Sequence, residues 1–250
     1  MGLRPYAHAV GRVRRHEEIE PTVANGFERR LLVPPERGSE LALETLRLGP
    51  VGALHLADDL HDTLLFVHTG TGRLETVGLA GAAAGLVCAG EAASLVAGNE
   101  GLACVRVTVG AATDLHAPMG ATEPVVALDH VEPGQATGAR SFQVLHGPHN
   151  GSTRATMFVG YIPPGKAPWH YHLYDEIVWI LRGEGRLHIG DDSEPLAPGV
   201  AFRLRPREVH IVENTQTGAE LAVLGIFTPA GSPSAAYLEP HVAGSYVFAG

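Results

Sequence analysis

Three residues with metal-ligand chemistry lie close together in the C-terminal half of the sequence, and a fourth follows them. The pattern is His170-x-His172-x3-Glu176, with His210 further along the chain. Alternate side chains of an extended strand share one face, so His170 and His172 are expected to point the same way. Glu176 has the same parity if no turn resets the strand. The spacing therefore places two imidazoles and a carboxylate on one wall, with His210 approaching from another strand.

Such a set of ligands suits one divalent transition metal. Imidazole favours Fe, Cu, Ni or Zn, and a carboxylate also admits Mn. Imidazole binds in its neutral form and the carboxylate in its ionised form, so we expect affinity for the metal to fall in acid.

The elements that must position these ligands are predicted to be short strands. Apolar runs with β-branched residues recur and are ended by Gly, Pro or Asn, and no segment has a strong amphipathic helix pattern. The clearest predicted strands are Ala155–Tyr161, Ile177–Leu181, Arg186–Ile189 and Ala222–Phe227. Gly81–Val87 is predicted as a loop or weak strand, and Ser234–Leu238 as a short helix. The pattern predicts an all-β sandwich or barrel.

An internal repeat divides the chain. Leu41–Leu74 aligns without gaps with Arg154–Leu187, so that the numbering of the two copies differs by a constant offset. Both copies contain an apolar strand, a Gly turn, a variable loop, a second apolar strand and a Gly-x-Gly-Arg-Leu turn. The sequence therefore predicts two copies of one β domain. We place them at residues 1–115 and 140–250, with a Gly-, Ala-, Thr- and Pro-rich linker at 116–139. The charged run RVRRHEEIE (residues 12–20) is predicted to be an exposed arm or an edge strand.

Composition excludes several classes of protein. Hydrophobic residues make up 45% of the 250-residue chain and the net charge is −9. This composition argues against disorder and against a nucleic-acid partner. No apolar run is long enough to span a membrane, and the start of the sequence lacks the core of a secretory signal, so we expect a cytoplasmic protein. The two cysteines are too few for a disulfide framework.

The ligand spacing resembles the two motifs of the cupin superfamily. The first motif is present as GKAPWHYHLYDEIVWILRG (residues 165–183), one residue shorter than usual before the first His. The second is present as GVAFRLRPREVHIVEN (residues 199–214). It lacks the usual inner Gly, with Glu208 near that place, and is one residue short between Pro206 and His210. Pro206 and Asn214 are expected to be structural, closing the turn next to the strand.

The resemblance implies a bicupin, with two jelly-roll β-barrels in tandem. It also implies that His170, His172, Glu176 and His210 are the metal ligands. A homodimer is expected by the same resemblance, because edge strands of cupin barrels commonly pair across dimers.

The first copy lacks the ligand residues. In the ungapped alignment, the positions of His170, His172 and Glu176 are occupied by Ala57, Asp59 and Thr63. The segment SLVAGNE (residues 94–100) has no histidine either. We expect a degenerate N-terminal barrel without a metal of this type, kept for packing, dimerisation or covering the other barrel. A different site built from His55, Asp58, Asp59 and His61 is the alternative.

Two arginines are candidate substrate-binding residues. Arg203 and Arg205 alternate with Phe202 and Leu204 on the predicted strand before Pro206. If the arginine face lines the barrel, the guanidinium groups could bind a substrate carboxylate in a bidentate manner. In the alternative, the arginines face solvent and Phe202 and Leu204 pack inside.

Five further residues are candidates for contact with substrate. Trp169 flanks the ligands at the expected barrel mouth, as do Tyr171 and Tyr174, and could stack on or hydrogen-bond to a substrate. Tyr161 lies on the preceding strand, where it could line the pocket or pack in the core. His188 follows the Gly turn and could act as a base behind the ligands.

The first functional hypothesis is an oxidoreductase resembling the non-haem dioxygenases of the cupin superfamily. It would act on a small polar or carboxylate-bearing molecule with Fe or Mn favoured as the metal, and Glu176 could shuttle a proton as the catalytic residue. The second is a non-oxidative isomerase, lyase or hydrolase, similar in architecture to ureidoglycine aminohydrolase. The third is a non-catalytic cupin that binds a small molecule.

Overall fold

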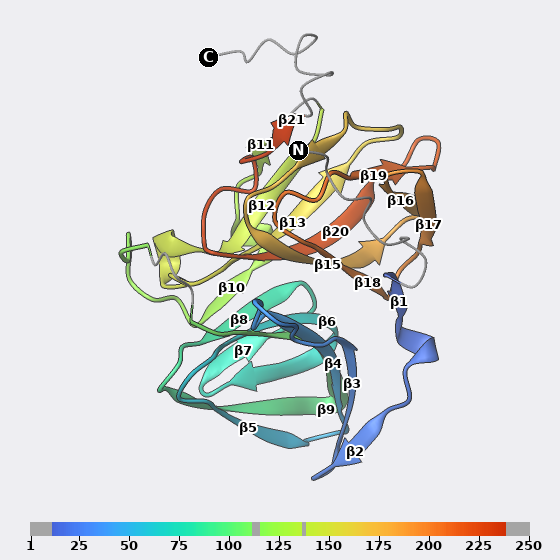
Figure 1. Cartoon of the computed structure of the whole chain (residues 1–250). Helices are drawn as coiled ribbons and strands as arrows, with labels where there is room; N and C mark the ends of the chain where they lie inside the picture. Colours follow the sequence, from blue (N-terminus) through green and yellow to red (C-terminus); the bar gives the residue numbers. More distant parts are fainter. Residues whose placement is uncertain (1–11, 112–115, 137–138, 239–250) are drawn as a thin grey trace.

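A computed structural model of the chain (Figure 1) describes residues 12–111, 116–136 and 139–238. Nearly all of the regular structure is β, as the sequence predicts. The helices in these ranges are three single 3-10 turns, η1 (His16–Glu18), η2 (Leu128–His130) and η3 (Pro148–Asn150). None of the helices in the described ranges could cross a bilayer.

The strands form two sandwich-like barrels, stacked one above the other in Figure 1. The N-terminal barrel is built on a nine-stranded sheet in the order β10-β8-β6-β9-β4-β3-β2, to which β5 and β7 add at β9 and β6. Its strands are β2 (Thr22–Ala24), β3 (Phe27–Val33), β4 (Ala42–Leu48), β5 (Ala53–Ala57), β6 (Asp62–Leu74), β7 (Val77–Leu79), β8 (Ala83–Val87), β9 (Ala92–Val109) and β10 (Val125–Ala127).

The C-terminal barrel combines three sheets. A seven-stranded sheet has the order β1-β18-β15-β20-β13-β12-β11, and the smaller sheets are β17-β16-β19 and β14-β21. The strands are β1 (Arg14–Arg15), β11 (Gly134–Gln135), β12 (Ser141–His146), β13 (Thr156–Ile162), β14 (His170–Tyr171), β15 (Asp175–Arg182), β16 (Gly185–Ile189), β17 (Asp192–Leu196), β18 (Val200–Leu204), β19 (Ile211–Asn214), β20 (Leu221–Thr228) and β21 (Tyr237–Leu238).

Strand β15 contributes to two hydrophobic cores because its successive side chains point to opposite faces of the sheet. Val178 and Ile180 face into the C-terminal barrel, whose core contains Phe202. Ile177 and Trp179 face the other way, into a large cluster that both barrels share. Burial on both faces explains why this strand reads as one continuous apolar run.

The sheet registers align the two copies more accurately than the ungapped sequence repeat. In the N-terminal barrel, Arg106 lies between Glu44 and Leu65 on its neighbouring strands. In the C-terminal barrel, Gly225 lies between Phe158 and Val178 in the same way. Leu65 thus corresponds to Val178, as in the ungapped alignment, whereas Glu44 corresponds to Phe158 and not to the residue before it. The first strand of the repeat is therefore displaced by one position.

The structure corrects one local prediction and decides between the alternatives of others. Ser234–Leu238 is not a helix, because its last two residues pair as β21 with β14. Within the apolar run at Gly81–Val87, residues Ala83–Val87 form a regular strand, β8, which lies between β10 and β6 in its sheet. The predicted linker contains β10, which extends the N-terminal sheet, and β11, which extends the C-terminal one. The charged arm is an edge strand, β1, and it pairs with β18 of the C-terminal barrel (Figure 1).

Candidate metal centre and its pocket

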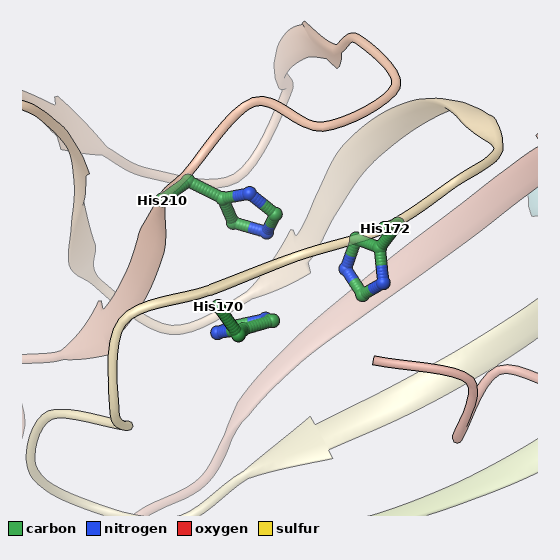
Figure 2. Close-up of side chains that lie close together, drawn as sticks. All are labelled: His170, His172 and His210. Carbon is green, nitrogen blue, oxygen red and sulfur yellow. The ribbon is translucent and has the colours of Figure 1, made fainter. Parts of the chain in front are cut away.

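Three histidines converge in the C-terminal barrel. His170 lies on β14, His172 follows it in the loop to β15, and His210 directly precedes β19. The main chains of His170 and His210 form an antiparallel bridge, with N–H to O=C distances of 2.9 and 3.3 Å. Figure 2 shows the three imidazole rings around one common space. One ring nitrogen of each lies within 4.8 Å of those of the other two.

Each ring is oriented by a main-chain carbonyl. The Nδ1–H of His170 donates to Pro168 O at 2.9 Å, and that of His210 donates to Glu208 O at 2.8 Å. His172 Nδ1 lies 3.4 Å from Ala235 O. A carbonyl only accepts hydrogen bonds, so these contacts place the proton on Nδ1 and leave Nε2 free to bind a metal.

All three histidines are neutral at pH 7. Burial lowers the pKa of His170 to about 4 and, helped by His170, that of His172 to about 3. Burial and the other two imidazoles lower the pKa of His210 well below its usual value. Neutral imidazole is the form that coordinates metals, so the donor set fits a divalent cation.

Glu176 lies beside the triad. The residue is 4% exposed, and Oε2 lies 3.7 Å from Nε2 of His172. Burial, with a smaller contribution from Asp175, raises the pKa of Glu176 to about 8. A buried carboxyl is protonated at neutral pH unless a cation is present to compensate its charge. Glu176 is thus placed to be either a fourth ligand or a proton donor.

The triad opens into a cavity of about 100 Å³ that is mostly apolar. Tyr174 stacks on His172, with ring centroids 4.5 Å apart, and Phe227 stacks on the other face of Tyr174 at 3.9 Å. Phe158 reaches the same wall because Gly225, opposite it, has no side chain. Aromatic packing therefore fixes the His172 ring and keeps the wall dry.

Arg140 brings a positive charge to this cavity. Its half-buried side chain is part of the lining, and its charge contributes to lowering the pKa of each of the three histidines. The sequence reasoning missed this residue, since it lies outside both motifs and has no equivalent that spacing could reveal.

The other residues predicted to contact substrate lie at different distances from the cavity. Tyr161 lines the cavity, and its hydroxyl donates to Oε1 of Gln143. Trp169 is half-buried next to His170 but is not among the lining residues. His188 lies on β16 and pairs through Nε2 with Glu213 at 2.6 Å, away from the cavity.

Arg203 is buried between the two barrels rather than in the cavity. Its guanidinium pairs with Asp175 at 2.7 Å and donates to the Pro34 carbonyl at 3.1 Å. It also donates to Ser39 Oγ and the Leu41 carbonyl.

Arg205 forms a bidentate ion pair with Glu36 near the surface, with both distances 2.7 Å. Phe202 and Leu204 occupy the barrel core instead. The arginine face of β18 therefore does not line the cavity.

The interior of the N-terminal barrel differs from that of the C-terminal barrel at the positions equivalent to Phe158 and Gly225. Where the C-terminal barrel has Phe158 and Gly225, it has Glu44 and Arg106, which form an ion pair of 2.5 Å. Glu44 is 6% exposed. Within the described ranges, the residues proposed for an alternative site include a surface pair, His61 with Asp58 at 3.1 Å, but no cluster of three ligands.

Comparisons with known proteins agree with this architecture. Residues 157–227 match the family model of the cupin domain. A solved structure of a mutant oxalate decarboxylase from Bacillus subtilis is similar, with a TM-score of 0.74 at 13% identity, over 93% of this chain and 80% of that chain. Oxalate decarboxylase from Lactobacillus farciminis, in a formate complex, has a TM-score of 0.76 at 11% identity, over 97% and 92% of the two chains.

These comparisons support the cupin superfamily and the tandem jelly-roll fold. A sequence comparison with curated proteins finds no match. At such low identities the structural likeness shows the fold alone, so the chemistry has to be argued from the site.

Proposed function

We propose that this cupin-domain chain is a metal-dependent enzyme that acts on a small carboxylate-bearing molecule, with its metal in the C-terminal barrel only. The observation that carries the proposal is the triad of His170, His172 and His210, whose Nδ1 atoms face main-chain carbonyls so that their Nε2 atoms remain available. In the N-terminal barrel, the ion pair between Glu44 and Arg106 occupies the positions equivalent to Phe158 and Gly225.

The donor set favours Fe or Mn over Ni, Zn or Cu. Three imidazoles with one adjacent carboxylate, Glu176, combine the ligand types that suit non-haem iron and manganese. When bound, such a metal supplies Lewis-acid and redox chemistry at the end of the cavity.

The cavity favours a small anionic substrate. Its volume of about 100 Å³ lies below the roughly 300–1,000 Å³ of pockets for drug-sized ligands. Arg140 supplies a positive charge at the lining, and guanidinium is suited to a carboxylate. Phe158 and Tyr174 exclude water from the wall, and Tyr161 borders the cavity with its hydroxyl held by Gln143.

Glu176 is the residue that we assign to proton transfer. Its carboxyl is buried beside His172, and the raised pKa lets it hold a proton near neutral pH. A group whose pKa lies near the working pH is effective in both accepting and donating a proton.

Two reaction classes remain candidates. The first is an oxidoreductase of the dioxygenase type, since three histidines and one carboxylate resemble the ligand set of such cupins. The second is a non-oxidative lyase, which is favoured by the similarity of the fold to oxalate decarboxylases. A homodimer remains a prediction for either class.

The metal site is tested by elemental analysis of protein purified without added metal. We expect about one equivalent of metal in the wild type and a loss of most of it in His170→Ala. The matched control is His130→Ala, because His130 is exposed in η2 and is not one of the candidate ligands. Full metal content in His170→Ala would exclude this centre.

The reaction class is tested with oxalate and a panel of small mono-, di- and keto-carboxylates. Fe- and Mn-loaded protein is assayed for O2 consumption and CO2 release. Consumption of O2 in proportion to substrate supports the oxidoreductase. Turnover with CO2 release and no proportional O2 uptake supports the lyase. Binding without turnover of any acid, by protein that holds its metal, would support a non-catalytic module.

A further inference from the structure

The N-terminal arm reaches the loop that carries one of the candidate ligands. Arg14 pairs with Ala201 and Arg15 with Val200, so β1 forms the edge of the C-terminal sheet. Val13, 4% exposed, packs in the core of this barrel. The arm is therefore anchored by its pairing with β18 and by the buried side chain of Val13, and these contacts fix where Arg12 lies.

Arg12 forms an ion pair with Glu208, a residue 196 positions away. Glu208 lies in the loop between β18 and β19 and is 1% exposed. Its other carboxylate oxygen accepts a hydrogen bond of 3.2 Å from the main-chain N–H of Arg205. A buried carboxylate is costly without a cation, and among the described residues Arg12 is the cation that the structure pairs with it.

Glu208 also orients the candidate ligand His210, through its own main-chain carbonyl. The carbonyl of Glu208 accepts the Nδ1–H of His210 at 2.8 Å. The loop also contacts a second ligand, because the N–H of Arg207 donates to the carbonyl of His172 at 2.6 Å. A shift of this loop would therefore move the hydrogen-bond acceptor of one imidazole and the main-chain support of another.

The sequence offers a reason for this arrangement. Glu208 stands near the place at which the motif that the chain resembles has a glycine. A buried carboxylate there needs a cationic partner. The guanidinium of Arg205, in the same loop, pairs with Glu36, and the arm supplies Arg12 instead.

We propose that Arg12 is a positioning residue for the metal centre. Through the carboxylate of Glu208 it holds the loop whose main chain orients His210. The inference rests on the proposed metal site, and it assigns to the N-terminal arm a role in metal affinity that the ligand motif does not contain.

The test measures Co²⁺ binding to metal-stripped protein, by visible absorption and by competition with a chelator. We expect Arg12→Gln to weaken Co²⁺ binding by up to roughly ten- to hundredfold and to change the absorption bands, because it displaces the carbonyl of Glu208 that orients His210, and disturbing such an outer hydrogen bond has effects of this size. Arg12→Lys keeps the charge and should restore most of the affinity. Arg14→Gln is the matched control, since Arg14 is exposed on the same arm.

A double-mutant cycle separates positioning from general destabilisation. Glu208→Gln removes the other half of the pair, and the double variant Arg12→Gln with Glu208→Gln should be much less than additive in its effect on affinity. Wild-type affinity and spectrum in folded Arg12→Gln or in Glu208→Gln would overturn the inference, as would additive effects. If His170→Ala also binds Co²⁺ as the wild type does, the proposed centre itself fails. If His170→Ala alone loses the metal, only the role of Arg12 fails.

Discussion

Gly225 on β20 and Phe158 on β13 lie directly opposite each other, and a Cβ atom on Gly225 would overlap the Phe158 ring. The same Cβ atom would lie 2.9 Å from Oε1 of Glu176. Phe158 and the carboxyl of Glu176 thus both occupy space that is free only because residue 225 has no side chain.

Gly225→Ala is therefore expected to destabilise the protein by about 1–3 kcal/mol, the usual cost of overpacking a core. It should also displace Phe158 or Glu176 and reduce activity. Urea unfolding and metal content check the effect. Gly78→Ala is the control, because a Cβ atom on Gly78 would meet nothing within 4 Å. Equal stability of the two variants would contradict the account.

Glu176→Gln should separate proton transfer from site architecture. The amide has the shape of the carboxyl but cannot exchange a proton, so turnover should fall by about 10²–10⁴-fold. The three histidines should still hold metal, with lower affinity. Parallel measurements of kcat and metal content test this, and full activity of the variant would remove Glu176 from the mechanism.

Arg140→Gln should raise the KM for a carboxylate substrate by about tenfold or more, since a charge-assisted hydrogen bond contributes roughly 1.5–3 kcal/mol. Metal content should not change. Arg205→Gln serves for comparison, because Arg205 pairs with Glu36 near the surface. An unchanged KM in Arg140→Gln would show that the substrate is not bound through this residue.

Arg203→Ala should reduce stability rather than substrate binding. The change leaves Asp175 buried without its partner at the junction of the two barrels, which typically costs about 3–5 kcal/mol. The exposed pair of Arg205 with Glu36 should contribute below about 1 kcal/mol. Calorimetry of both alanine variants distinguishes the two. A rise in KM for Arg203→Ala at unchanged stability would favour a substrate-binding role instead.

Acid should destabilise the protein through His146, which is fully buried in β12. Burial lowers its pKa to about 4. The unfolded chain takes up this proton near pH 6.5, so between about pH 6.5 and 4 the unfolded state binds more protons and stability falls as the pH falls. The contribution is at most about 3 kcal/mol.

His146→Leu removes this group. Between pH 7 and pH 4.5 the free energy of unfolding should therefore fall less for the variant than for the wild type. Urea unfolding of the metal-free proteins at both pH values measures it. A difference independent of pH would show that His146 does not titrate as proposed.

The sequence identified the three histidines that converge in the structure because their spacing is a local pattern. Their close spacing brought His170 and His172 to attention, although His172 lies in the loop after β14 and not on the strand that parity assumed. The all-β class and the repeat were predictable for the same reason, since each rests on patterns within short windows.

Residues whose partners are distant in sequence could not be placed in this way. The direction of Arg203 depends on Ser39, Pro34 and Leu41, all more than 160 positions away in the other barrel. The short strand at Tyr237–Leu238 forms because β14 offers it an edge, although its own sequence suggested a helix. In both cases tertiary contacts outweigh local preference.

The pairing of β1 with β18 also has a consequence for synthesis on the ribosome. Arg14 is translated 187 residues before its partner Ala201. At about 5–20 residues per second, the arm waits roughly 10–40 s for the strand that completes it. All strands of the N-terminal barrel are translated while Arg14 and Arg15 still lack their partner strand. The C-terminal barrel then incorporates a strand that was translated before the strands of the N-terminal barrel.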